Sequence, residues 1–435
     1  MKKDQQAILQ KLGIDKLNPM QIQAQKAILT NNEVVLLSPT GTGKTLAFLL
    51  PIIEELDSDL DQVQALIIVP SRELAIQIEN VVREMGSGFK TNAVYGGRAG
   101  SKDKIELKHA PAILIGTPGR IADHLRRQNF VTDDLKVLVL DEFDKSLEIG
   151  FEKEMREIIH YLPSLQKKIL TSATQKVEIP DFLKVESPKK LDFLGETKSQ
   201  LKIKIVKSPT KDKLDTLARL LGHVGKGRGI IFCNLKDTIQ WVSDYLTDKN
   251  IGHACFYGGL EQVDRERALI KFRNGTHNYL LATDLAARGI DVPEIDFIIH
   301  LQLPYKEEEF THRNGRTARM HAEGTAYIIK SPSDRLPDFI QGAEEEELTT
   351  VFLPLDSMEW TTLFISGGRK DKISKGDIAG LFFKQGKLEK DELGNIELKQ
   401  DCAFVAVPAS KADRLIKQLS NTHLKKKKVR ISLLE

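Results

Sequence analysis

The sequence predicts two consecutive α/β domains, each built on a doubly wound parallel sheet, followed by a small α+β domain. Short apolar runs rich in β-branched residues alternate with segments of helical periodicity, which is typical of strands that helices cover on both faces. This alternation occurs in two successive series. A third region, residues 361–435, differs from both in its basic charge.

Two series of apolar runs define the expected sheets. The first comprises Val34 to Leu37, Ala65 to Val69, Ala112 to Ile115, Val137 to Leu140 and Ile169 to Leu170. The second comprises Gly229 to Cys233, Ala254 to Phe256, Tyr279 to Ala282, Phe297 to Leu301 and Ala326 to Ile329. Helical periodicity lies between the runs, as in residues 72–85.

Two polar segments suggest the domain boundaries. Residues 195–200 have no apolar period, so we expect a flexible linker there. The acidic run at residues 342–347 predicts a second break, between the second sheet and the basic region. The expected domains therefore span residues 1–200, 201–345 and 360–435.

The composition is that of a globular protein, with 41% hydrophobic and 29% charged residues. No apolar run approaches the roughly 18 to 20 residues that cross a bilayer, and the polar start lacks the apolar core of a secretion signal. Cys233, Cys255 and Cys402 have neither disulfide nor zinc-ligand spacing. We therefore expect a cytoplasmic protein with no membrane partner.

The charge is unevenly distributed along the chain. Residues 361–435 contain 16 Lys and Arg against 9 Asp and Glu, a net charge of +7. Because the whole chain carries +3, the residues before them carry −4. This asymmetry indicates an appended basic module, and the alternative is a solvated lysine-rich face.

A glycine-containing loop, Ser-Pro-Thr-Gly-Thr-Gly-Lys-Thr, follows the first predicted strand at residues 38–45. Its glycines allow backbone N–H groups to surround phosphate oxygens at the start of a helix. Lys44 would reach the β- and γ-phosphates of ATP, and Thr45 would offer a hydroxyl to Mg²⁺. Ser38 stands where the general phosphate-loop pattern has glycine. The nucleotide contacts that we expect here are Thr40, Gly41, Thr42, Gly43, Lys44 and Thr45.

Asp141 and Glu142 follow another predicted strand, Val137 to Leu140. One carboxylate can hold the Mg²⁺ shell while the other orients or activates water. An isolated Asp-Glu pair is usually only solvated, but Lys44 upstream makes it significant. We expect Lys44, Asp141 and Glu142 to be catalytic, with Thr45 and Asp141 holding Mg²⁺ partly through water.

The order of these and further motifs resembles that of the DEAD-box RNA helicases over roughly residues 12–330. The sequence Asn-Pro-Met-Gln at residues 18–21 resembles the family's adenine motif, which implies that Gln21 contacts adenine. Residues 70–74, 96–97 and 117–120 resemble RNA-contacting motifs of the first domain. The RNA contacts that they imply are Arg72, Gly97, Thr117 and Arg120. The resemblance also implies that both sheets are RecA-like domains.

The second half of the chain carries the remaining family motifs. His-Arg-Asn-Gly-Arg-Thr-Ala-Arg at residues 312–319 resembles the arginine motif, which implies that Arg316 and Arg319 contact the γ-phosphate. Residues 283–291 resemble a segment that approaches both ligands. That likeness implies an RNA contact from Thr283 and nucleotide contacts from Gly289 and Asp291. Two further RNA contacts implied by a second-domain motif are Gln262 and Arg265.

The segment that couples ATP to unwinding in the family resembles residues 172–174, Ser-Ala-Thr. The implied coupling residues are Asp144, Ser172, Thr174 and His312. Phe143 replaces the alanine of the DEAD sequence, and its ring either packs behind the strand or alters how Asp144 meets its partners. Asn314 and Ala318 also depart from the arginine motif. No departure removes a charged catalytic group, so we expect hydrolysis to be retained.

Residues 361–435 show strand, helix, strand, strand, helix and strand signals in turn. Residues 363–368 and 402–407 resemble the two ribonucleoprotein motifs of RNA-recognition modules, the second in degenerate form. Phe364 and Phe404 are therefore either base-stacking residues or part of a core. The basic side chains that either grip phosphates or solubilise a turn are Lys425, Lys426, Lys427, Lys428 and Arg430.

Residues 376–381 and 429–434 make this region similar to the C-terminal domain of DbpA-type bacterial helicases. That resemblance implies an RRM-like fold that binds structured large-subunit ribosomal RNA during ribosome assembly. The chain is thus expected to be a monomeric, RNA-stimulated ATPase and RNA helicase that uses ATP and Mg²⁺. Two alternatives remain: an RNA chaperone or ATP-gated clamp without a ribosomal address, and a DNA-directed superfamily 2 motor.

Overall fold

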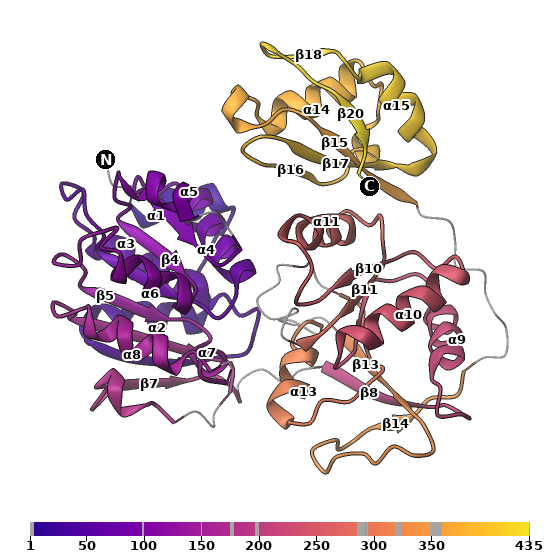
Figure 1. Ribbon diagram of the computed structural model, residues 1–435, viewed down its shortest axis with the longest axis horizontal. Coiled ribbons are helices and arrows are strands. Elements are labelled where there is room, and N and C mark those ends of the chain that lie inside the picture. Colours follow the sequence, from indigo (N-terminus) through magenta and orange to yellow (C-terminus); the bar gives the residue numbers. More distant parts are fainter. Residues whose placement is uncertain are drawn as a thin grey trace. The chain divides into compact units, whose positions relative to one another are not determined.

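The computed structural model describes residues 4–97, 100–148, 150–174, 178–195, 200–284, 292, 295–317, 323–348 and 359–434. The described residues form two compact units, one within residues 1–199 and one beginning at residue 200. The first unit holds one α/β domain. The second unit holds another α/β domain and the small C-terminal domain (Figure 1).

The first α/β domain is built on a parallel sheet whose described strands run in the order β3-β4-β2-β5-β6-β1-β7. The strands are β1 (Glu33–Leu37), β2 (Ala65–Ile68), β3 (Thr91–Val94), β4 (Ile113–Gly116), β5 (Val137–Leu140), β6 (Lys167–Ser172) and β7 (Lys189–Asp192). The predicted strands are all present. β3 and β7 were not expected, because β3 contains Thr and Asn and β7 is mostly exposed.

Helices cover both faces of this sheet (Figure 1). One face packs on α1 (Gln5–Leu12), α2 (Pro19–Thr30), α3 (Lys44–Glu55) and α4 (Arg72–Met85), and the other on α5 (Gly100–Leu107), α6 (Pro118–Arg126), α7 (Phe143–Glu148) and α8 (Glu152–His160). Successive residues of one strand enter opposite cores: Leu138 lies with Ile121 and Val139 with Ile78. Strands buried on both faces in this way explain the uninterrupted apolar runs.

The second α/β domain repeats the parallel architecture, with described strands in the order β10-β11-β9-β12-β13-β8-β14. The strands are β8 (Gln200–Lys207), β9 (Gly229–Phe232), β10 (His253–Phe256), β11 (Tyr279–Ala282), β12 (Phe297–His300), β13 (Glu323–Lys330) and β14 (Glu344–Glu345). The described helices are α9 (Leu214–Val224), α10 (Lys236–Asp248), α11 (Gln262–Arg273) and α13 (Glu307–Asn314). Helices α9 and α10 pack on one face of the sheet, and Phe310 of α13 packs on the other.

The acidic run at residues 342–347 contains the last described strand of the second sheet. Glu344 and Glu345 form the edge strand β14, which pairs with β8. Lys204 of β8 forms an ion pair of 2.7 Å with Glu346, and this pairing holds the pKa of Glu346 below its usual range. The glutamates therefore neutralise lysines of β8. In the predicted linker, residues 196–199 lie outside the described residues and β8 begins at Gln200.

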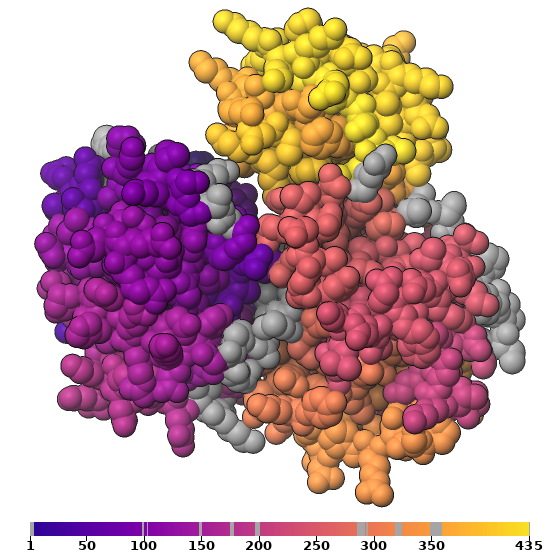
Figure 2. All heavy atoms as spheres, viewed as in Figure 1, coloured from indigo at the N-terminus to yellow at the C-terminus, as the bar shows by residue number. Residues whose placement is uncertain are grey.

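The C-terminal domain is a four-stranded antiparallel sheet in the order β16-β17-β15-β20 among its described strands. It comprises β15 (Trp360–Ile365), α14 (Lys375–Lys384), β16 (Ile396–Leu398), β17 (Ala403–Pro408), α15 (Ala412–Leu419), the hairpin β18 (His423–Leu424) and β19 (Lys427–Lys428), and β20 (Ile431–Leu433). Apart from the hairpin, this is the predicted element order. Helices α14 and α15 cover one face of the sheet, and side chains fill the space between the elements (Figure 2).

No helix among the described residues has both the length and the apolar character needed to span a bilayer.

Candidate ATP site and RNA-contact motifs

The phosphate loop connects the carboxyl end of β1 to the first residue of α3. Gly41 and Gly43 have φ angles of 85° and 86°, a region that glycine adopts without steric penalty. The Ser38 hydroxyl lies 2.7 Å from the Thr42 hydroxyl, so serine in place of glycine ties the loop to itself. Lys44 donates to the carbonyl oxygens of Ser38 and Pro39, at 2.6 and 2.8 Å. The loop is thus closed around its own lysine.

The predicted adenine motif joins this loop through the start of α2. Asn18 caps the helix by accepting from the Gln21 N–H at 2.9 Å, and Gln21 Oε1 accepts from the Asn18 N–H at 3.0 Å. Both side chains also reach the phosphate loop. Asn18 donates to the Thr42 carbonyl at 3.0 Å, and Gln21 donates to the Gly43 carbonyl at 3.3 Å. The structure therefore brings Gln21 to the phosphate loop.

Asp141 lies at the carboxyl end of β5 and is almost completely buried. The Thr171 hydroxyl of β6 donates to Asp141 Oδ1. Burial raises the pKa of the Asp141 carboxyl, whereas the Thr171 hydrogen bond and the positive charge of Lys44 act to lower it. Lys44 is thus near enough to favour the ionised form of Asp141. Glu142 follows with φ of 49°, an uncommon conformation for a residue other than glycine.

The predicted coupling residues of the first domain form a second cluster beside this one. Thr174 donates its hydroxyl to Asp144 Oδ2 at 3.1 Å, and the Thr174 N–H donates to the Ser172 hydroxyl at 3.0 Å. The Ser172 carbonyl accepts from the Ser38 N–H at 3.0 Å. This chain of hydrogen bonds connects the phosphate loop to the coupling segment and to Asp144. His312, the fourth predicted coupling residue, lies on α13 of the second unit.

Phe143 packs in the core of the first domain, with only 1% of its surface exposed. It belongs to the apolar cluster that contains Leu140 and Met155. Of the two alternatives for this departure from the family sequence, the structure favours packing behind the strand. Asp144 is hydrogen-bonded to Thr174 despite the larger neighbour.

The predicted RNA contacts of the first domain follow neighbouring strands. Arg72 begins α4 after β2, and Gly97 follows β3 with φ of 85°. A Cβ atom on Gly97 would lie 2.5 Å from Arg72 Nη1, so the two residues are adjacent and a side chain at Gly97 would displace the arginine. Thr117, which precedes α6, makes no side-chain capping bond. All three follow the carboxyl ends of parallel strands, where such sheets bind ligands.

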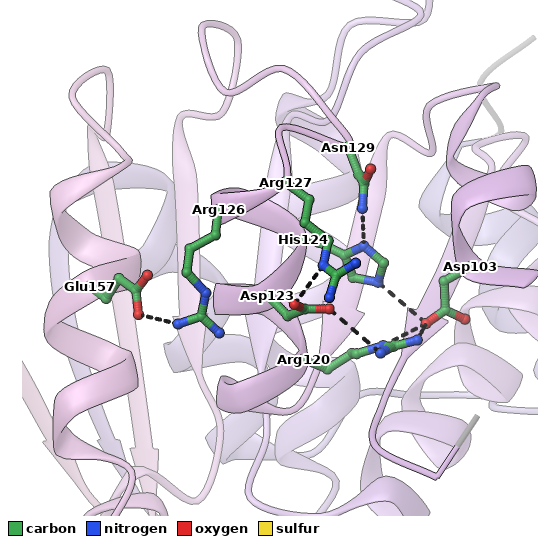
Figure 3. A network of polar contacts seen from close by, with 8 residues as sticks. All are labelled: Asp103, Arg120, Asp123, His124, Arg126, Arg127, Asn129 and Glu157. Atoms are coloured by element: carbon green, nitrogen blue, oxygen red, sulfur yellow. Dashed lines mark hydrogen bonds and ion pairs between the residues drawn. The ribbon is translucent and has the colours of Figure 1, made fainter. Parts of the chain in front are cut away.

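Arg120 is held by acidic side chains on both sides (Figure 3). Its Nε and Nη2 atoms lie 2.8 and 2.7 Å from Asp103 Oδ2, and its Nη1 lies 3.7 Å from Asp123 Oδ2. Asp103 is fully buried and also contacts Nε2 of buried His124 at 3.3 Å. Asp103 and His124 had no signal in the sequence, because Asp103 stands between two lysines and His124 lies outside the motif. Together they fix the direction of the Arg120 guanidinium.

The arginine motif of the second domain is anchored by a residue that sequence reasoning missed. Buried Arg313 forms an ion pair with Asp284, donates to the Gln302 carbonyl at 2.6 Å and to Asn234 Oδ1 at 2.8 Å. Asn314, which departs from the family sequence, bonds through Oδ1 to Nε2 of His300 at 2.9 Å. Burial, aided by the charge of Arg313, lowers the pKa of His300 to about 3. The neutral histidine therefore donates to Asn314 and fixes the end of α13.

Arg316 is also buried and follows α13 directly. Arg319, Gly289 and Asp291, which were predicted to contact nucleotide, lie outside the described residues. Thr283 is half-buried after β11, and Gln262 begins α11.

Arg265 of α11 is buried, and its guanidinium lies 4.8 Å from the ring centroid of Phe256. A stacked guanidinium of this kind is held in one orientation by the ring. Neither the burial of Arg265 nor its stacking on β10 was visible in the sequence pattern.

Phe364 and Phe404 lie opposite each other on β15 and β17, with ring centroids 5.8 Å apart. They occupy the face of the C-terminal sheet that α14 and α15 leave open, because their neighbours Leu363 and Val405 enter the helix-covered core. Phe364 is half-buried, whereas Phe404 is only 7% exposed.

The lysine-rich segment lies in and beside the β18–β19 hairpin. Lys425 pairs with Asp377 of α14 at 3.0 Å, and Lys427 lies 3.7 Å from Asp371. Lys426, Lys428 and Arg430 are exposed. The hairpin therefore presents a basic surface while two of its lysines are tied to the domain beneath.

Comparisons with known proteins agree with this arrangement. Residues 18–182 match the DEAD/DEAH box helicase family, residues 212–321 the helicase conserved C-terminal domain and residues 362–433 the DbpA RNA binding domain. The ATP-dependent RNA helicase DbpA of Escherichia coli is 32% identical over 447 residues, which cover 98% of this chain and 96% of that protein. Its Bacillus subtilis namesake is 30% identical over 464 residues, with the same coverage.

Two solved structures resemble the helicase part of the chain. Dbp5 of S. cerevisiae, bound to RNA and ADP BeF3, has a TM-score of 0.67 and 27% identity, covering 76% of this chain and 88% of Dbp5. The DEAD-box helicase Mss116, bound to ssRNA and UDP-BeF, has a TM-score of 0.68 and 25% identity, covering 80% of this chain and 79% of Mss116. With phosphate loop, carboxylates and C-terminal domain all in place, the chain belongs to the DEAD-box family of ATP-dependent RNA helicases and is DbpA-like over nearly its whole length.

Proposed function

We propose that this chain uses ATP to remodel structured large-subunit ribosomal RNA in the cytoplasm, as a monomer. One observation carries the ATPase half of this proposal: the carboxyl ends of β1, β5 and β6 bring Lys44, Asp141 and the Asp144–Thr174 pair into one hydrogen-bonded, mostly buried site. A site of this composition binds and cleaves a nucleoside triphosphate, because it offers a cation for phosphate and carboxylates for metal and water.

Each polar group of this site has a proposed task. Gln21 binds adenine, and the residues that cradle the phosphates are Thr40, Gly41, Thr42, Gly43, Lys44 and Thr45. Glu142, which follows Asp141 with a φ angle of 49°, orients the attacking water. Arg316 and Arg319 stabilise the γ-phosphate charge from the second domain, and Gly289 and Asp291 approach the nucleotide.

The donor set fits Mg²⁺. Thr45 supplies a hydroxyl and Asp141 a carboxylate of which Oδ1 already accepts from Thr171, so few protein oxygens remain and water must complete the shell, as Mg²⁺ prefers. When bound, the ion would neutralise phosphate charge. Asp141 must be ionised to hold it, and the Thr171 hydroxyl and Lys44 favour that state.

RNA binding is proposed to use two sets of residues. The helicase domains would hold one strand through Arg72, Gly97, Thr117, Arg120, Gln262, Arg265 and Thr283. The C-terminal domain would bind RNA through the lysine hairpin, Lys425, Lys426, Lys427 and Lys428, with Arg430. Contacts from the helicase domains to the RNA backbone do not select a sequence. Selection of ribosomal RNA must therefore come from the C-terminal domain.

The ribosomal address rests on the C-terminal domain, whose matched family is described as the DbpA RNA binding domain. The test compares ATP turnover of the full chain with large-subunit ribosomal RNA and with an unrelated structured RNA of equal length. We expect stimulation by the ribosomal RNA at much lower concentration. Control chains end at residue 360, or carry glutamine at the four hairpin lysines, and should lose the preference while keeping basal turnover. Equal stimulation by both RNAs would contradict the address and favour a general RNA chaperone.

Local strand separation is proposed to accompany ATP binding by both helicase domains. A duplex-unwinding assay with a non-hydrolysable ATP analogue tests this, because a single round should separate strands without hydrolysis. Absence of any separation would contradict the proposal. Two further measurements distinguish the alternatives. With ATP itself, a clamp would bind RNA without turnover. With DNA duplexes, a DNA-directed motor would track DNA and ignore the 2′-OH.

A further inference from the structure

The open face of the C-terminal sheet makes a set of contacts that the RNA-binding proposal does not use. This face, here called the outer face, consists of Thr362 and Phe364 on β15, Glu397 on β16, and Phe404 and Ala406 on β17. Neither α14 nor α15, the two described α-helices of this domain, covers it. Even so, Thr362 is only 1% exposed and Ala406 only 2%.

Polar contacts with the end of α11 explain the burial of Thr362. Its hydroxyl lies 2.7 Å from the Thr276 hydroxyl and accepts from Asn274 Nδ2 at 3.2 Å. Asn274 Oδ1 in turn accepts from Asn395 Nδ2 at 3.2 Å. Thr276 and Asn274 are themselves buried. Because buried hydroxyls and amides are costly without partners, these bonds specify one alignment of the two surfaces.

A bidentate ion pair lies beside this cluster. Arg273, the last residue of α11, places Nε and Nη2 each 2.7 Å from the two carboxylate oxygens of Glu397. The two side chains are 19% and 15% exposed, so the pair is largely shielded from solvent. Paired, planar contacts of this kind are directional and are stronger than exposed ion pairs.

Two further ion pairs, both more exposed to solvent, lie at the border of the interface. Lys399 lies 2.5 Å from Glu266 of α11, and Lys226 lies 2.7 Å from Glu359. They add little energy, because both are solvated. Each of them nevertheless places a lysine amine beside a glutamate carboxylate at the border of the contact.

We propose that the outer face is the docking surface for the second helicase domain, through the end of α11 and residues 273–276, and is not a platform for RNA bases. Phe364 and Phe404 then pack beside this interface. RNA bound by the C-terminal domain lies elsewhere on it, and the lysine hairpin is the basic surface that remains.

Docking at this point connects the two RNA-binding parts of the chain through one rigid element. Gln262 and Arg265 lie in the first turn of α11, and Arg273 in its last. The 12 residues of the helix span about 18 Å at roughly 1.5 Å per residue. RNA held by the C-terminal domain is therefore presented to α11 at a fixed distance and direction.

Zero-length cross-linking of the full chain tests the docking directly. A carbodiimide joins amine and carboxylate groups that are already in contact, and mass spectrometry identifies the linked peptides. We expect Lys226–Glu359 and Lys399–Glu266 links in the free chain, with yields that change less than two-fold when saturating ribosomal RNA is added. Absence of both links, or their loss on adding RNA, would overturn the proposal, the latter by showing that RNA takes the outer face.

Charge reversal provides the specific control. Arg273→Glu should lower both yields several-fold, and Arg273→Glu combined with Glu397→Arg should restore them. Lys249→Glu, an exposed reversal on the same domain, should change neither. Failure of the double substitution to restore the links in a folded chain would contradict the proposed pairing.

A base-stacking variant separates docking from RNA binding. Phe364→Leu keeps an apolar side chain on the outer face and removes the ring. We expect RNA affinity within two-fold of the parent. A stacking platform would instead lose roughly 5- to 150-fold for each base, and a loss of that size would overturn the proposal.

Discussion

The side chain of Phe143 adjoins the catalytic carboxylates in sequence and yet lies in the core. We expect Phe143→Ala to leave ATP turnover per folded molecule within several-fold of the parent. The cavity should lower the free energy of unfolding by about 3–5 kcal/mol. Phe143→Leu should have the smaller effect on stability. Turnover and thermal unfolding are measured together, and a large loss of turnover at unchanged Tm would show that the ring belongs to the site.

Burial raises the pKa of Asp141, and the Thr171 hydroxyl opposes that effect. Its hydrogen bond favours the carboxylate, so Thr171→Val should raise the already elevated pKa of Asp141 further. Since the ionised form is needed for Mg²⁺, activity falls as pH falls through that pKa. The acid limb of the kcat/KM profile for ATP should therefore move to higher pH. Thr171→Ser keeps the hydroxyl and should leave the limb in place; an unshifted or lowered limb for Thr171→Val would contradict this role.

Asp103 holds the guanidinium of Arg120, and its substitution tests whether this support matters for RNA binding. Asp103→Asn removes the buried charge that holds the guanidinium, so we expect RNA affinity to fall several-fold to tenfold with little change in ATP turnover at saturating RNA. Asp123→Asn weakens a 3.7 Å contact with Arg120, together with the 2.7 Å pair between Asp123 and exposed Arg127, and should have the smaller effect on RNA affinity. Equal RNA affinities for the parent and Asp103→Asn would show that Arg120 needs no such support.

At single positions, the sequence singled out residues that stand in motifs and missed residues that orient other side chains. Lys44, Asp141 and Gln21 stand in recognisable motifs and meet at one site. Asp103 and Arg313 act by holding another side chain or a helix end, and that task leaves no local pattern. Ser38 appeared to be a defect in the phosphate loop, but its hydroxyl bonds to Thr42, a contact that only coordinates could show.

The N-terminal cap of α2 links a structural element to nucleotide binding. Asn18→Ala removes the cap and the bond to the Thr42 carbonyl, so it should cost about 0.5–2 kcal/mol in stability and raise the KM for ATP. Asp4 caps α1 in the same way, accepting from the Ala7 N–H at 2.7 Å, without touching the loop. Asp4→Ala should therefore lower stability alone. Denaturation curves and ATP kinetics of both variants check this prediction. An equal change in the KM for ATP in both variants would contradict a specific role of the α2 cap in nucleotide binding.

Whole elements were predictable where burial made the sequence apolar. All ten predicted strands are present because both faces of each parallel sheet are covered. Two of the missed strands lie where burial is incomplete: β7 is mostly exposed, and β8 alternates lysine with apolar residues. The missed strand β3 is largely buried but contains Thr and Asn. The acidic run that forms β14 suggested a domain break, because the lysines of β8 that balance its charge lie far away in the sequence.

Over the whole molecule, the order of motifs gave the domain types and the reaction. The motif order did not predict the contact between the C-terminal sheet and the end of α11, because Thr362, Asn274 and Thr276 belong to no motif. Such an interface depends on which surfaces meet, and no local pattern in a single sequence shows which surfaces these are.

The proposed function has ATP and RNA bind one molecule, with catalytic groups contributed by both helicase domains. Binding of each ligand must then strengthen binding of the other by the same factor. The most direct measurement determines the Kd of a non-hydrolysable ATP analogue with and without RNA, and the Kd of RNA with and without the analogue, for the parent and Arg316→Gln. We predict equal enhancements in the parent, at least several-fold, and their loss in Arg316→Gln with analogue binding alone retained. Independent binding of the two ligands to the parent chain would contradict the account.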